Sequence, residues 1–249
     1  MSTCRVLYAY FNEAKYECIR VLRTPAFVAP FFVLPAALYL LFGVFLFGDE
    51  IRRTPHLSEF LYLGFSVFGV MGPGMFGFGV SVATEREQGL VTLKRALPMP
   101  APAYLIAKMF MSMIFACVVM VSMILSGVLA GHPALTLAQM LLVAGILVLG
   151  SLPFCAMGLF IGTRVSAKSA PAFVNLAFLP LVYLSGVIIM LPPSVQWISR
   201  FSPAFYLEQI ALRAAGLPSY ASPALSVSVL AAVTLLPARF AIRRLARIG

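Results

Sequence analysis

The sequence has little charge for its length. Only 10% of the 249 residues are charged and 61% are hydrophobic, whereas a typical soluble domain has about 25% charged residues. The apolar residues also cluster in runs of roughly 18 or more, the length needed to cross a bilayer core. This composition excludes an ordinary soluble domain and predicts an integral membrane protein.

Residues that ligate metals or form disulfides are also few. The two histidines, His56 and His132, lie far apart and have no cluster of cysteines or acids beside them, so we expect no metal site. The four cysteines contain no CxxC pair, and none falls in a segment that we place outside the cell. We therefore expect no disulfides.

Several functional motifs are missing as well. No GxxxxGKS or GxxxxGKT phosphate loop is present, so the chain does not bind ATP by that route. No catalytic side chains gather at one depth, which argues against a membrane enzyme. The net charge of +10 comes without a basic stripe and interleaved aromatics, so we expect no nucleic acid partner.

The apolar runs predict an all-α membrane protein with six transmembrane helices in a single domain, residues 1–249. The first run is too long for a signal peptide and should be retained as a span. Residues 3–23 mix apolar and charged side chains at roughly helical spacing, which indicates an interfacial helix or a plain basic anchor. Residues 192–220 are too apolar for a loop and too rich in proline to span, so short re-entrant helices are expected there. The predicted spans are 26–48, 60–82, 104–130, 137–162, 170–191 and 222–238.

The basic residues predict how these spans are oriented. Fourteen lysines and arginines lie in or beside the N-terminal segment, the second-to-third loop, the fourth-to-fifth loop and the tail, and four lie in the remaining loops. Basic residues collect on the cytoplasmic side of a membrane. Both termini should therefore be cytoplasmic in a multi-pass protein of the inner (plasma) membrane.

The second predicted span is rich in glycine. Two of its glycines, Gly72 and Gly74, flank Pro73. Small residues let helices approach closely, and the triplet should kink the helix. The many glycines of this span fit either close packing against neighbouring helices or a gate.

The loop after this span reads ATEREQGLVTLKRALPMP. Thr84 and Glu87 have the spacing of a capping box, and acids precede bases as the helix dipole favours. A leucine stripe follows from Leu90 at helical spacing, and prolines end the pattern. The loop therefore predicts a short amphipathic helix in the cytoplasm over residues 84–97.

This helix could rest on lipid or dock against protein. A helix that rests on anionic lipid usually carries basic residues along its polar face. This one begins with two acids, Glu85 and Glu87. The order of charges favours docking against a protein.

Two stretches of the sequence resemble the permease subunits of type-2 ABC exporters. The stretch ATEREQGLVTLKRALPMPAPAYLIAKM is similar to that family's E-R-E-x-G loop, which is followed by a span that starts near a lysine. The stretch FVNLAFLPLVYLSGVIIMLPPSVQWISRFSPAFYLEQIALR resembles the family's fifth span and its re-entrant region, with Trp, Pro-x-x-Tyr, Glu and Arg in order. Together with the six expected spans, the resemblance covers nearly the whole chain.

The resemblance implies a transport subunit that is not itself an enzyme. Two permease copies, or this chain and a close relative, would pair with two copies of a separate ATPase subunit, which would hold ATP and magnesium. The helix 84–97 would be the coupling helix, the turn 163–169 a lesser contact, and the first and fifth spans most of the permease dimer interface. The residues implied for ATPase coupling are Glu85, Arg86, Glu87, Leu90, Leu93, Lys94 and Arg95.

The substrate is predicted from the side chains of the spans. Their many phenylalanines and methionines suit a hydrophobic or amphipathic molecule, such as a lipid, a drug-like compound or a secondary metabolite. A polysaccharide or glycolipid is the alternative within the same family. Asn175 could face the path or make an interhelical hydrogen bond. The candidates for the path or the dimer seam are Phe65, Met71, Asn175, Phe178 and Tyr183.

An ion-coupled secondary transporter is the alternative from another class. Such proteins normally need ionisable residues within their spans. The sequence predicts none in the span interiors, with Lys108 at a mouth of the third span. This argues for energy supplied by a partner.

Overall fold

The computed structural model describes residues 25–46, 50, 53–54, 56–91, 93, 103–130, 135–188 and 196–248. Within these residues the chain forms helices joined by turns, without any strand. The all-α prediction is therefore confirmed for the described part. The predicted interfacial helix 3–23 lies outside the described residues.

The helices follow one another in a simple order. The first half contains α2 (Pro25–Leu40), the π-helical η1 (Leu41–Leu46), α4 (Leu57–Gly72), the π-helical η2 (Pro73–Gly77), α5 (Phe78–Glu87) and α7 (Ala103–Ala130). The second half contains α8 (Leu137–Gly162), α9 (Ala170–Ser185), the 3-10 helix η3 (Gln196–Phe201), α10 (Pro203–Ala214) and α11 (Pro223–Ile248).

Four helical segments in the described part are long and apolar enough to cross a membrane. They are Leu57–Glu87, Tyr104–Ala130, Leu137–Gly162 and Pro223–Leu245. Two shorter apolar helices, Ala29–Gly43 and Ala170–Ser185, lie on the predicted first and fifth spans.

Two helices differ in length from the spans predicted at their positions. The helix of the fifth predicted span ends at Ser185 and not at residue 191, because Gly186 adopts a left-handed conformation, φ 77°, that ends α9. The helix of the sixth continues past residue 238 to Ile248. It continues because the arginine-rich tail keeps a strong helix propensity after the apolar run has ended.

The second predicted span forms one continuous helix made of α4, η2 and α5. The triplet at which the kink is predicted lies where the π-helical turn η2 begins, at Pro73. Proline has no N–H for the preceding turn, so the regular bonding pattern is interrupted there. A Cβ added at Gly79 would lie 2.9 Å from Cγ2 of Val174 on α9. The close-packing interpretation of the glycines is therefore the one the structure supports.

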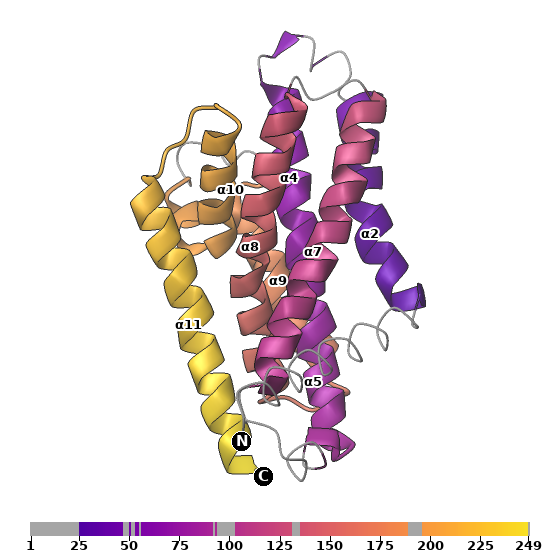
Figure 1. The fold of residues 1–249 in the computed structure, drawn as a ribbon. Coiled ribbons are helices and arrows are strands. Elements are labelled where there is room, and N and C mark those ends of the chain that lie inside the picture. Colours follow the sequence, from indigo (N-terminus) through magenta and orange to yellow (C-terminus); the bar gives the residue numbers. More distant parts are fainter. Residues whose placement is uncertain are drawn as a thin grey trace, which may run out of the picture.

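The long helices run side by side, as Figure 1 shows. The end of α5, the turn between α8 and α9, and the end of α11 lie at one end of this bundle, which we call the α5 end. The helix α10 and the turn to α11 lie at the other, which we call the α10 end. The continuous helix α4–η2–α5 is largely buried, whereas α11 is peripheral and exposes an apolar face.

Candidate functional site

Two segments that are far apart in the sequence meet at the α5 end. The guanidinium of Arg86 donates hydrogen bonds to the backbone carbonyl of Thr163 and, at 2.6 Å, to that of Val165. The carboxylate of Glu87 accepts a 2.9 Å hydrogen bond from the backbone N–H of Ala167. The two cytoplasmic loops predicted from the sequence therefore form one joined surface.

Glu85 lies inside the bundle and not on this surface. Its side chain is only 2% exposed, and its Oε1 lies 2.8 Å from Nζ of Lys108, which is 1% exposed. The hydroxyl of Tyr104 donates to Oε2 of Glu85 at 2.6 Å, and Lys108 also donates to the Ser81 hydroxyl at 2.9 Å. A buried ion pair needs such additional hydrogen bonds to offset its desolvation. Glu85 thus ties α5 to α7.

This pair adds a partner for Lys108 that the sequence did not reveal. The sequence places Lys108 at a mouth and predicts no ionisable side chain in the span interiors. The structure buries Lys108 one helical turn inside α7, where the carboxylate of Glu85 is its partner. Nothing in the sequence indicated this pairing, because Glu85 lies 23 positions earlier in the chain, just past the apolar run.

The predicted capping box at Thr84 is also wrong. Thr84 lies within α5, and its hydroxyl donates a 3.0 Å hydrogen bond to the carbonyl of Val80. The long helix continues through this position, so no free N–H groups are left there to cap. Instead α5 ends at Glu87, Gly89 turns the chain with φ 72°, and helical residues resume at Leu90.

The predicted leucine stripe is only partly covered after this turn. Leu90 is half-buried, whereas Leu93 is 64% exposed. Lys94 and Arg95 lie outside the described residues. The α5 end therefore presents an exposed leucine beside a hydrogen-bonded polar surface.

The five residues predicted for the path or the dimer seam do not form a single site. Phe65 and Met71 are buried in the core of the bundle. Asn175 and Tyr183 lie on the exposed face of α9. Phe178 borders an apolar cavity.

Phe178 belongs to an aromatic cluster between α9 and the α4–η2 helix. Its ring centroid lies 5.6 Å from that of Phe68 and 5.2 Å from that of Phe76. The three rings border a small apolar cavity of about 180 Å³, and α2 supplies another of its walls. The other lining residues are Phe31, Leu34, Pro35, Gly69 and Gly72. Sequence reasoning missed most of them because, among 21 phenylalanines, composition does not tell which rings share a cavity.

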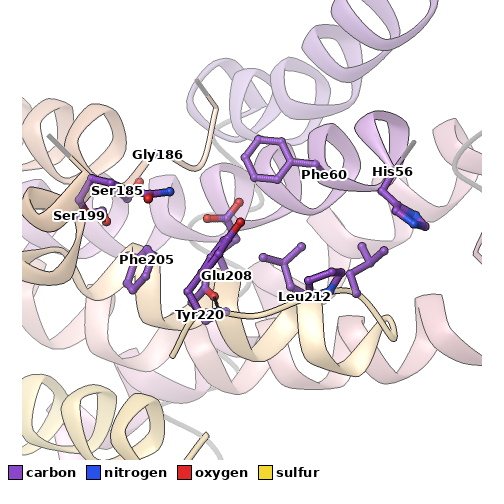
Figure 2. A pocket seen from close by; sticks show the side chains of 13 residues that line it. His56, Phe60, Ser185, Gly186, Ser199, Phe205, Glu208, Leu212 and Tyr220 are labelled. Carbon is purple, nitrogen blue, oxygen red and sulfur yellow. Dashed lines mark hydrogen bonds between the residues drawn. The ribbon is translucent and has the colours of Figure 1, made fainter. Parts of the chain in front are cut away.

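A second pocket, of about 340 Å³, lies at the α10 end (Figure 2). Its walls come from the beginning of α4, from η3 and α10, and from the turns that follow α9 and α10. The described lining residues are His56, Phe60, Ser185, Gly186, Gln196, Ser199, Phe205, Glu208, Gln209, Leu212, Leu217, Pro218 and Tyr220. Sequence reasoning missed this pocket, and its only signal was the glutamate in the re-entrant pattern.

The described residues offer no obvious metal centre. In this part of the chain, no three side chains of histidine, cysteine, aspartate or glutamate lie close enough together to hold a metal ion. What the geometry provides is a joined polar surface at the α5 end, an apolar cavity beside Phe178 and a pocket of mixed polar and apolar lining at the α10 end.

The sequence as a whole is similar to known transport proteins. The family described as "ABC-2 type transporter" matches residues 10–214. The chain is also 25% identical over 193 residues to the protein named "Putative transport permease YvfS" of Bacillus subtilis (strain 168). That similarity covers 76% of this chain and 78% of the relative.

Proposed function

Because the chain belongs to the ABC-2 type transporter family, it is the membrane subunit of an ABC transporter, and we propose that it exports a hydrophobic or amphipathic substrate. The substrate, a lipid, a drug-like molecule or a secondary metabolite, leaves the cytoplasm or the inner leaflet. Energy comes from ATP and magnesium bound on a separate ATPase partner.

The proposed topology has six spans, with both termini in the cytoplasm and the α5 end on the cytoplasmic side of the inner membrane. Four long apolar helices and two shorter ones support six crossings. The excess of lysine and arginine in the segments assigned to the cytoplasm supports this orientation. In this arrangement α10 and η3 are the re-entrant helices of the outer leaflet.

The observation that carries the coupling proposal is the joined surface at the α5 end. Arg86 and Glu87 bind the turn between α8 and α9 through three hydrogen bonds. A force applied to the segment after Gly89 therefore reaches α5, α8 and α9 together. The ATPase would dock here, with the exposed Leu93 as an apolar contact and Lys94 and Arg95 as polar contacts.

In this proposal Glu85 has a different role from the ATPase contact that the sequence predicted for it. Its buried pair with Lys108 connects α5 to α7, so it transmits movement between helices and does not touch the ATPase. Movement of the coupling segment would then reach α7 without unfolding the intervening helix.

The apolar cavity beside Phe178 supports a hydrophobic substrate. Its lining consists of phenylalanine, leucine, proline and glycine, which adapts to apolar ligands and offers no hydrogen bonds to sugars. A polysaccharide or glycolipid substrate is therefore less well supported. The exposed face of α9, which includes Asn175 and Tyr183, is the proposed seam with a second permease, and two ATPase copies complete the complex.

Ion-coupled transport remains the alternative from another class, because the bundle does contain buried ionisable groups. The Glu85 carboxylate, however, is held by Lys108 and Tyr104. A carboxylate bound in this way is poorly suited to exchange ions. This alternative predicts that the purified chain alone transports its substrate in liposomes when an ion gradient is applied and no ATP is present.

The coupling proposal is tested by the double variant Glu87→Lys with Leu93→Asp. We expect it to abolish substrate-stimulated ATP hydrolysis by the copurified ATPase, because one substitution breaks the bond to the α8–α9 turn and the other places a charge on the docking leucine. The rate of ATP hydrolysis is measured in reconstituted complexes with and without substrate.

The matched control makes the same two kinds of change at the α10 end, with Glu50→Lys and Phe201→Asp. Both positions are exposed, so the control should keep its coupling. If the first double variant folds and still couples as the wild type does, the α5 end is not the docking surface.

A further inference from the structure

The pocket at the α10 end contains a buried carboxyl group without a partner. Glu208 lies on α10 and is only 2% exposed. No hydrogen-bond donor in the described structure reaches its Oε1. Figure 2 shows Glu208 in the middle of the pocket, between Phe60 and Ser185. Buried polar groups are rarely left unpaired. A ligand that enters the pocket could therefore supply the missing partner of this carboxyl group.

The surroundings of Glu208 do not supply a counter-charge. Of the described lining residues, only His56 can become positively charged. Its Nδ1 lies 3.8 Å from the carboxylate of Glu59, and its own side chain is 61% exposed. Burial without a cationic neighbour raises the pKa of Glu208 to about 8. A positive group entering the pocket would therefore restore the ionised form.

The walls of the pocket match an organic cation. Phe60, Phe205 and Tyr220 supply aromatic rings, whose faces attract ammonium groups. Ser185 and Gln196 add hydroxyl and amide oxygens that could accept hydrogen bonds from an amine. A volume of about 340 Å³ is sufficient for a small ligand or a head group.

Other ligands fit less well. An anion is repelled by the ionised form of Glu208 and would be released as the pH rises. Calcium requires six to eight oxygen ligands, and Glu208 is the only carboxylate among the described lining residues. A wholly apolar ligand would leave the carboxyl group unpaired.

We propose that the pocket around Glu208 binds the ammonium group of a cationic, amphipathic substrate. The assignment of this ligand as a substrate rests on the proposed export function, whereas binding itself does not. Its place at the α10 end, remote from the coupling surface, makes it a site that the substrate occupies late, on the outer side of the transport path.

Binding is tested directly, without the ATPase. The full chain is purified in dodecyl maltoside, and binding of radiolabelled tetraethylammonium is measured by equilibrium dialysis. Neutral N,N-diethylacetamide and anionic pivalate serve as competitors. We expect saturable binding of the cation, with competition by neither compound. The single tryptophan, Trp197, lies beside Gln196 in η3, so its fluorescence should change on saturation and locate the ligand at this pocket.

The key variant is Glu208→Gln, which keeps the shape of the side chain and removes its charge. It should bind tetraethylammonium at least about tenfold more weakly, the effect of about 1.4 kcal/mol of lost attraction. Glu59→Gln is the matched control, because Glu59 is also a buried acid of this end but does not line the pocket. It should bind as the wild type does. Equal binding by a folded Glu208→Gln variant, or effective competition by the neutral compound, would overturn the proposal.

A pH series keeps the test decisive if Glu208→Gln does not fold. Apart from Glu208 itself, the titratable and charged groups on α10 and the described elements packed against its end of the bundle are His56, Glu59, Tyr62, Tyr183, Arg200, Tyr206, Arg213 and Tyr220. His56→Asn removes the histidine, and asparagine tolerates the left-handed conformation, φ 63°, of that position. In this variant the affinity for tetraethylammonium should rise from pH 6 to pH 9, because raising the pH ionises Glu208. A flat profile would contradict the assignment.

The binding result and the transport result can fail separately. If the cation binds but substrate does not stimulate a partner ATPase, the site stands and the export function fails. If ATPase coupling is observed but no cation binds, the export function stands and its substrate is not cationic.

Discussion

The residue whose role changed most between sequence and structure is Lys108. In the sequence it is a charge at the edge of an apolar run. In the structure its ammonium lies 2.8 Å from Glu85 and contacts the hydroxyl of Ser81. Charges this deeply buried persist only as pairs, because each ion alone would carry a large desolvation cost. The two residues should therefore be studied as one unit.

Lys108→Met should destabilise the protein by about 3–5 kcal/mol, because it leaves the Glu85 charge buried without its main partner. Thermal unfolding of the purified protein measures the loss. The double variant Glu85→Gln with Lys108→Met should recover much of it, since both charges are then absent.

The control for this prediction is Lys168→Met. Lys168 is exposed in the turn between α8 and α9, so its loss should change the stability by no more than about 0.5 kcal/mol. A Lys108→Met variant that melts at the wild-type temperature would show that the buried pair does not stabilise the bundle.

At the scale of helices, glycines bring α8 against the α4–η2–α5 helix. A Cβ added at Gly158 of α8 would lie 2.7 Å from the carbonyl oxygen of Met75 and 2.8 Å from that of Gly74. Both obstacles are backbone atoms, which do not move aside as a flexible side chain would. Close helix contacts through small residues are the usual means of association in a membrane.

Gly158→Ala should therefore force α8 away from η2 and destabilise the protein by about 1–3 kcal/mol, as overpacking does elsewhere. Gly145→Ala on the same helix is the matched control. A Cβ there meets nothing within 4 Å, so alanine should be neutral or stabilise by about 0.5–1 kcal/mol. The two melting temperatures should move in opposite directions or differ clearly. Equal effects of both substitutions would show that the backbone contact is not tight.

At the scale of the whole molecule, the two ends of the bundle should face opposite sides of the membrane. The turn between α8 and α9 belongs to the proposed cytoplasmic end, and the turn between α10 and α11 to the opposite end (Figure 1). Lys168 and Ser222 are exposed in these two turns. They provide a direct test of orientation.

We expect Ser222→Cys to react with a membrane-impermeant maleimide in intact cells. Lys168→Cys should react only after the membrane is opened. Both are made in a version of the chain in which the four native cysteines are replaced, and labelling is read by the mass shift. Labelling of Lys168→Cys in intact cells would reverse the proposed orientation.

Much of the fold followed from local sequence properties. The predicted spans 104–130 and 137–162 coincide closely with the helices α7 and α8, because in both cases the apolar run and the helix end at the same residue. The end of α9 is not marked by the apolar pattern, because a single residue, Gly186, stops the helix inside an apolar run. The cap at Thr84 was misplaced because the helix does not stop where the membrane core does.

The candidate site was less predictable. Arg86 and Glu87 were chosen for their charge, but their contacts with the α8–α9 turn join segments about 80 positions apart. Phe178 was chosen among many similar residues, and its partners Phe68 and Phe76 were not. No local pattern distinguishes a ring that borders a cavity from one that fills the core.

The sequence by itself determined the class of environment, the helical content and the distribution of basic residues, because hydrophobicity, helix propensity and charge are properties of short segments. Only the tertiary structure decided which ionisable groups are paired and which are not. Glu85 and Glu208 are both glutamates next to apolar segments, yet one is held by Lys108 and Tyr104 and the other lies in a pocket with its Oε1 unpaired. The physical reason is that pairing depends on which distant helix brings a donor within about 3 Å, and that distance is set by packing alone.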